Sequence, residues 1–175
     1  ELIAAALQLV AKVADGSQLS LDPELDTHHM MNVAVMRGPK QTENTAKLAT
    51  FGTSILASKE LGALRHDQMI QWSEIQRYID DDVEASYQAG IGCFPEVARL
   101  FDMEGTDAAF DAFMDAVSDQ ILGAALQGSA DRYRELGERV IAKQNELNGK
   151  LLDRLDMRLG QRIDHGQQML ALEVG

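Results

Sequence analysis

Apolar residues recur at intervals of three and four positions along most of this chain, which is the spacing of one face of an α-helix. The pattern is clearest from Met69 to Tyr87. It recurs in residues 2–13, 46–61, 110–121 and 147–163. The alternation of apolar and polar residues that is typical of a strand is absent from these segments. The sequence therefore predicts an all-α protein.

Start and stop signals divide this pattern into separate helices. Asp22-Pro23-Glu24 places a side-chain acceptor at the N-cap, proline at the first helical position and a carboxylate in the first turn. Gly105-Thr106-Asp107 offers a similar cap, and Gly128-Ser129 separates the last two helices. The predicted helices cover residues 1 to about 15, about 23 to 61, a third segment that is ended by Gly90, Gly92 and Pro95, about 105 to 126, and one from 130 to beyond Ile163.

Gly38-Pro39 interrupts the second predicted helix. Proline lacks the backbone N–H that an α-helix needs, and its ring clashes with the preceding turn. We therefore expect a kink or a short break at this dipeptide.

Long helices with tight connections predict an antiparallel helical bundle of the four-helix-bundle type. The 175 residues suit a single domain over 1–175, and no linker long enough to divide the chain is present. Four glycines in the last helix are expected to mark close contacts with neighbouring helices. They are Gly137, Gly149, Gly160 and Gly166.

The charge of the chain is strongly negative and unevenly distributed. The net charge of −12 disfavours binding to nucleic acid or to anionic lipid headgroups. Residues 61–128 carry 13 acidic and 3 basic side chains, whereas residues 129–175 carry 8 of each. Lys150, Arg154 and Arg158 form a basic row with Arg162, and this row is expected to pair with the acidic middle helices. If the row lined a cavity, it would instead suit an organic anion or a phosphate.

The Gly38-Pro39 interruption is the predicted ligand region. A break frees backbone carbonyls, and Asn32, Arg37 and Lys47 flank it. One interpretation is a pocket between helices in which these side chains contact a small molecule. The other is a structural kink with exposed polar side chains.

His28 and His29 lie close to three acidic residues, so a metal site was weighed against polar packing or surface histidines. Adjacent helical residues point about 100 degrees apart, so the two imidazoles cannot both face one ion without distortion. Polar packing or surface histidines are therefore preferred to a metal site, and no metal or cofactor is predicted. The chain also lacks the motifs of phosphate-binding loops, zinc peptidases and serine hydrolases, so no catalytic site is predicted within it.

The segment Leu21-Asp22-Pro23-Glu24-Leu25-Asp26-Thr27-His28-His29-Met30-Met31, followed by Arg37-Gly38-Pro39, resembles a pattern in all-helical sensor regions of bacterial transmembrane receptors. Those regions read approximately LDPDLDSYYLMD and then RLP. The family includes sensor histidine kinases, methyl-accepting chemotaxis receptors and diguanylate cyclases. This chain carries His28-His29 where the family usually has two tyrosines, and Gly38 where it has leucine.

The resemblance implies an extracytoplasmic, periplasmic domain of an inner-membrane protein, with membrane helices before and after the residues present here. We expect the domain to bind a small molecule, with organic anions as candidates, through His28, His29, Asn32, Arg37 and Lys47. We also expect it to form a homodimer and to relay helix displacement to a histidine kinase. The alternatives are the sensor domain of a chemotaxis receptor or a diguanylate cyclase, and a ligand-free bundle that binds another protein.

Overall fold

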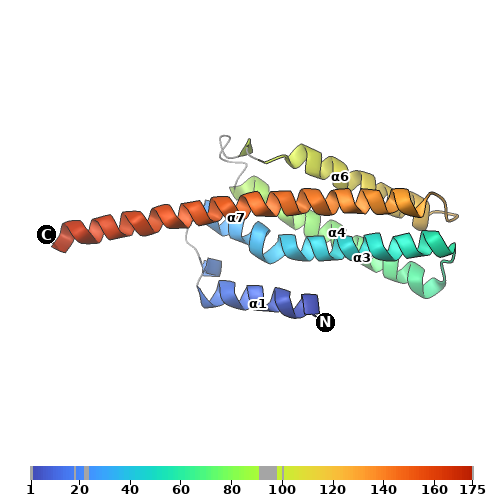
Figure 1. The fold of residues 1–175 in the computed structure, drawn as a ribbon, viewed down its shortest axis with the longest axis horizontal. Helices are drawn as coiled ribbons and strands as arrows, with labels where there is room; N and C mark the ends of the chain where they lie inside the picture. The colour runs from blue at the N-terminus through green and yellow to red at the C-terminus, as the bar shows by residue number, and fades with distance from the viewer. Residues whose placement is uncertain (1, 18, 22–23, 91–97, 100, 175) are drawn as a thin grey trace.

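The computed structural model describes residues 2–17, 19–21, 24–90, 98–99 and 101–174 (Figure 1). Every regular element in these ranges is helical, which confirms the predicted all-α class. None of the helices described there is both long enough and apolar enough to cross a lipid bilayer.

Helix α1 (Leu2–Gly16) is apolar but lies outside the main core. Its bounds agree with the first predicted helix. Ala14 is its only buried side chain, and its contacts are with the short 3₁₀ turn η1 (Leu19–Leu21) and the segment that follows α2. Figure 1 shows α1 below the longer helices, near the N-terminus.

The second predicted helix is a continuous helical run made of α2 (Leu25–Met31), the π-helical η2 (Asn32–Arg37) and α3 (Gly38–Ser58). The proposed Asp22-Pro23 start lies outside the described residues, and Glu24 occupies the N-cap position. The run ends at Ser58, before the predicted Leu61, because Lys59 adopts a left-handed backbone conformation with φ 56°.

The helical run continues through Gly38-Pro39, where a kink or short break was expected, and π-helical hydrogen bonding precedes the dipeptide. The Gly38 N–H donates to the Val33 carbonyl, five residues back, and Pro39 follows at the start of α3. Because Pro39 has no backbone N–H, it cannot donate the α-helical hydrogen bond to the carbonyl four residues earlier. The wider π-helical turn lies directly before this missing bond.

The remaining long helices are α4 (Ala63–Gly90), α6 (Met103–Ala116) with the π-helical η3 (Val117–Ile121), and α7 (Ala130–Val174). The predicted start after Ser129 is confirmed. Helix α4 ends at Gly90, the first of the three residues predicted to end it, and Gly92 and Pro95 lie outside the described residues. The predicted cap at Gly105-Thr106-Asp107 is wrong by several residues. Asp102 is the N-cap, and its carboxylate accepts from the Gly105 N–H at 3.0 Å.

Helix α7 organises the packing of the other helices. It lies along α3 and contacts α6, while α4 packs against α3 and α2 (Figure 1). The buried apolar side chains form two clusters. One joins the second half of α3 to α6 and the start of α7, around Phe113 and Tyr133. The other joins α2 and η2 to the end of α4 and the middle of α7, around Met30 and Leu151.

A layer of buried polar side chains lies between the two clusters along α3, α4 and α7. The Asn44 amide donates to Gln76 Oε1 at 2.9 Å, and the Gln76 amide donates to Thr45 Oγ1 at 3.0 Å. Gln144 of α7 completes the layer, with its Oε1 3.2 Å from Thr45 Oγ1. These contacts satisfy polar groups of Asn44, Thr45 and Gln76 that would be costly to bury alone, whereas Gln144 Nε2 is buried without a hydrogen-bond partner.

The predicted role of the α7 glycines is right at one position and wrong at three. A side chain at Gly137 would meet the methyl group of Ala49 on α3, so this glycine allows a close helix contact. Gly149, Gly160 and Gly166 have open space where a Cβ would lie. Spacing alone did not distinguish these cases, because a close contact requires a partner helix at that level.

Candidate functional site

The two predicted site histidines lie at the interface of α2 with α4. Both are partly buried, and their rings meet edge to face with centroids 5.4 Å apart. His29 packs against the Gly90 backbone, where a Cβ would collide with it. Burial, together with the nearby His28, lowers the pKa of His29 below its ordinary value. The His29 Nδ1 atom is buried without a hydrogen-bond partner. Among the described residues, no group of three or more metal-binding side chains gathers.

Asn32 and Arg37 also face α4. The Asn32 amide donates to Ser86 Oγ at 2.8 Å, and Arg37 Nε lies 2.7 Å from the Asp82 carboxylate. Both side chains are partly buried, so these contacts tie η2 to α4. The guanidinium of Arg37 already has a carboxylate partner in this arrangement.

Lys47 points away from these four residues. It lies on α3, and its ammonium group is 2.9 Å from Glu43 Oε1, one helical turn earlier. It lines a groove of about 930 Å³ that separates α1 from α3 and α7. The predicted site residues are thus divided: His29, Asn32 and Arg37 contact α4, and Lys47 lines the groove.

The groove is mostly apolar, with polar groups at a few positions. Its size falls at the upper end of the range usual for small-molecule sites, about 300–1,000 Å³. The apolar lining comes from several elements, namely Ile3 of α1, Ala34 of η2, Pro39, Ala46 and Phe51 of α3, Trp72 of α4 and Leu152 of α7. Phe51 and Trp72 meet edge to face with ring centroids 5.3 Å apart, which fixes the aromatic end.

The polar groups of the groove come from α3 and α7. Glu43 balances the charge of Lys47, so the pair adds no net charge. Asn145 and Asn148 present amides from α7, and the hydroxyl of Thr42 is buried without a hydrogen-bond partner. A largely apolar molecule with one or two hydrogen-bonding groups fits this lining.

Gly38 and Pro39 contribute to the groove through close packing. Pro39 lines the groove directly, and the Asn148 amide lies against Gly38, where no side chain would fit. Gly38 therefore lets α7 approach α3 at the end of the groove. Of the five predicted site residues, Lys47 is the one among the described residues that line this groove.

Sequence reasoning missed the α7 wall of this groove. Gln144, Asn145 and Asn148 interrupt the apolar pattern just before the Leu147 and Leu151 steps of the leucine row. The signal in the sequence that could have indicated this wall is a set of uncharged polar residues beside the buried leucine row. These residues line a groove only because α3, which lies about a hundred residues earlier in the chain, packs against α7.

The ion pairs of the basic row on α7 that the described residues show lie with Glu24 and with α7 itself. Arg158 and Arg162 each lie 3.5 Å from the Glu24 carboxylate, and Lys150 lies 2.7 Å from Glu146 on its own helix. A link between α7 and the acidic middle segment is made by Lys143, whose ammonium lies 2.6 Å from Asp102.

Comparisons of this chain with models of known protein families, with curated proteins and with solved structures gave no match.

Proposed function

We propose that this chain is the extracytoplasmic signal-sensing domain of a transmembrane two-component sensor histidine kinase. A small molecule binds in the groove between α1, α3 and α7, and binding displaces α1 relative to α7. The observation that carries the proposal is that one apolar groove of about 930 Å³ is lined by residues of both the first and the last helix. The segment that resembles bacterial sensor regions, Leu21 to Pro39, ends at this groove.

The proposal includes an antiparallel four-helix arrangement of α3, α4, α6 and α7, with a bend of the helical run at Gly38-Pro39. The packing of α7 on α3 and α6, and of α4 on α3, supports the arrangement. The π-helical turn before Pro39 supports the bend, because such turns accompany changes in helix direction.

The weak attachment of α1 gives the groove a means to signal. A ligand shifts a conformational equilibrium only by the difference between its affinities for the two states. Because α1 buries only Ala14, a ligand that contacts Ile3 on one side and Leu152 on the other changes the position of α1 at little cost to the core. A displacement of one or two Å suffices for a helix-shift mechanism.

The expected ligand is a small organic molecule, with organic anions among the candidates. Lys47 is the predicted site residue that lines the groove, and a ligand carboxylate would replace Glu43 as its partner. In this proposal the domain works as a homodimer on the periplasmic side of the inner membrane, anchored by flanking segments.

Two alternatives remain as proposals. The same domain serves equally well as the sensor of a chemotaxis receptor or a diguanylate cyclase, because the ligand site does not depend on the output. A ligand-free protein-interaction bundle is favoured by one specific observation, the exposed apolar side chains of α1. They include Leu2, Ile3, Leu9 and Val13.

Trp72 is the only tryptophan of the chain and lines the groove, so its fluorescence reports on groove occupancy. We would screen small organic molecules for saturable changes in this fluorescence, using the full chain. Ala46→Met places a longer side chain in the groove, and Ala57→Met is the control on an exposed position of the same helix.

The proposal predicts hits whose affinity falls at least roughly tenfold in Ala46→Met and is unchanged in Ala57→Met, since the added side chain occupies the ligand's volume. Equal affinity of every hit for both variants would place binding elsewhere. A broad screen without hits would favour the protein-interaction alternative.

A further inference from the structure

Arg154, in the basic row of α7, has a guanidinium nitrogen without an acceptor. Its Nε is buried and has no hydrogen-bond partner, and its Nη1 lies 3.9 Å from the thioether sulfur of Met157, which is a weak acceptor. The neighbouring Arg158 and Arg162 lie beside Glu24. A partly buried cation without a counter-ion is unfavourable unless an anion satisfies it.

The same side chain lines a cavity of about 360 Å³, formed with Phe101, Lys150, Asp153 and Met157. The Phe101 ring is buried and meets the Tyr87 ring edge to face at 6.1 Å between centroids, so this wall is held in place. Met157 provides a second apolar wall that can adapt its shape. The cavity therefore combines apolar walls with one unpaired guanidinium.

The other charges of the cavity restrict what it can bind. The Lys150 ammonium lies 2.7 Å from Glu146 and is already paired. Asp153 adds a carboxylate that would repel a second negative charge. Arg154 can thus accommodate one carboxylate, but the second negative charge of a dianion would be repelled by the Asp153 carboxylate.

We infer that this cavity binds a small monocarboxylate with an aromatic or aliphatic body, the carboxylate on Arg154 and the body between Phe101 and Met157. A guanidinium presents two parallel N–H groups to a carboxylate, which makes such pairs strong and directional. None of the residues that line this cavity lines the α1–α3–α7 groove, so the site is separate from the one in the proposed function.

Benzoate is the first probe, with benzamide as its uncharged counterpart of the same shape. We would label methionine methyl groups with ¹³C in the full chain and titrate each probe by NMR. The Met157 methyl should shift saturably with benzoate, whereas Met169, exposed on the far end of the same helix, should not. Benzamide should bind at least roughly tenfold more weakly, because it cannot form the charged pair. Phenylacetate and hexanoate extend the panel, and succinate tests the exclusion of dianions.

Arg154→Gln should lose benzoate affinity by roughly tenfold or more, and Arg154→Lys should retain part of it. Arg139→Gln, at an exposed arginine of α7, is the matched control and should bind benzoate like the parent chain. Circular dichroism checks that each variant is folded. The inference is wrong if no monocarboxylate of the panel shifts Met157, if benzamide binds as tightly as benzoate, or if folded Arg154→Gln keeps the parent affinity. Ala46→Met in the groove should leave benzoate affinity unchanged, so the two sites succeed or fail independently.

Discussion

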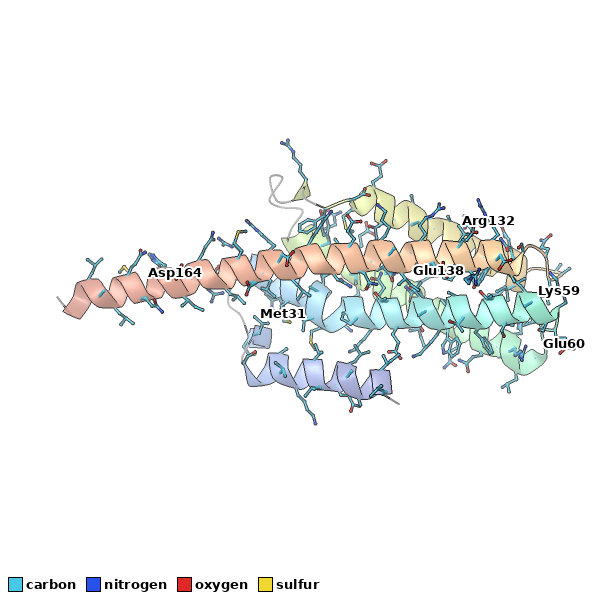
Figure 2. All side chains as sticks on the ribbon, viewed as in Figure 1. Met31, Lys59, Glu60, Arg132, Glu138 and Asp164 are labelled. Atoms are coloured by element: carbon cyan, nitrogen blue, oxygen red, sulfur yellow. The ribbon has the colours of Figure 1, made fainter. Side chains whose placement is uncertain are left out.

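The two parts of α7 carry the same apolar period but have different surroundings. In the proximal part (Ala130–Leu155), Tyr133, Val140, Leu147 and Leu151 are buried. In the distal part (Asp156–Val174), Ile163 is 60% exposed and Leu172 is 78% exposed. Figure 1 shows the distal part extending beyond the other helices, and Figure 2 places Glu138 within the packed region and Asp164 outside it.

This difference shows that an apolar stripe identifies the face of a helix that can pack. The stripe is buried only where another helix lies beside it. The α3 and α6 helices supply the partner for the proximal part. The distal part and α1 expose apolar side chains to solvent. Both are at the ends where the proposed function requires connections to a membrane.

The largest expected effect is the loss of core packing in the proximal part. Leu151→Ala should lower the free energy of unfolding by about 2–5 kcal/mol, because a fully buried leucine leaves a cavity. Leu172→Ala, the control in the distal part, should change it by less than about 0.5 kcal/mol. Urea denaturation followed by circular dichroism measures both, and similar losses would show that the distal part is also packed in solution.

Alanine substitutions at two glycines of α7 should change the stability of the protein in opposite directions. Gly137→Ala should destabilise the protein by about 1–3 kcal/mol, because the added methyl meets Ala49. Gly160→Ala should stabilise the helix by up to about 1 kcal/mol, because its Cβ enters open space. Thermal melts of the two variants test this, and a stabilising Gly137→Ala would mean that the α3–α7 contact is looser than described.

The pH dependence of the packed region should come largely from Asp80 of α4. Burial raises its pKa to about 7, with Asp107 of α6 and the nearby Asp81 and Glu84 adding repulsion, while the hydrogen bond from Gln41 at 2.6 Å opposes the rise. The folded state therefore binds the proton more tightly than the unfolded state. Stability should fall as pH rises from the ordinary value near 3.8 to about 7.

Hydrogen exchange, corrected for intrinsic rates, can compare the two parts of α7 over this pH range. Protection of the proximal part should decrease toward pH 7, whereas the distal part should change little. Asp80→Asn should reduce the pH dependence, because an amide cannot lose the proton. An unchanged pH profile in that variant would assign the effect to other groups.

The smallest effect is expected in α1. Leu9 is 63% exposed, so Leu9→Gln should change the unfolding free energy by less than about 0.5 kcal/mol. A loss comparable to that of Leu151→Ala would show that α1 is covered in solution, as it would be in a dimer. Sedimentation equilibrium of the parent chain and of this variant would then show whether a second copy of the chain covers α1.

Part of the candidate site could be predicted from sequence. Lys47, which the sequence assigned to the ligand region, lines the groove together with Pro39. The π-helical turn directly precedes Gly38-Pro39, where the sequence predicted a kink or a short break. The side on which Asn32 and Arg37 point could not be predicted, because the π-helical turn changes the angular position of every residue around it. The unpaired guanidinium of Arg154 was equally hidden, since Lys150, Arg158 and Arg162 have the same spacing but different partners.

The sequence by itself determined the helical class and most helix ends, because period, caps and helix breakers act over a few neighbouring residues. Gly90 and Ser129 are correct boundaries for this reason. Tertiary structure decided which apolar stripe is buried, which glycine is a contact, and which cation lacks a partner. Each of these depends on side chains far away in the chain, such as Ala49 opposite Gly137 or Asn148 against Gly38, and no local pattern specifies that distance.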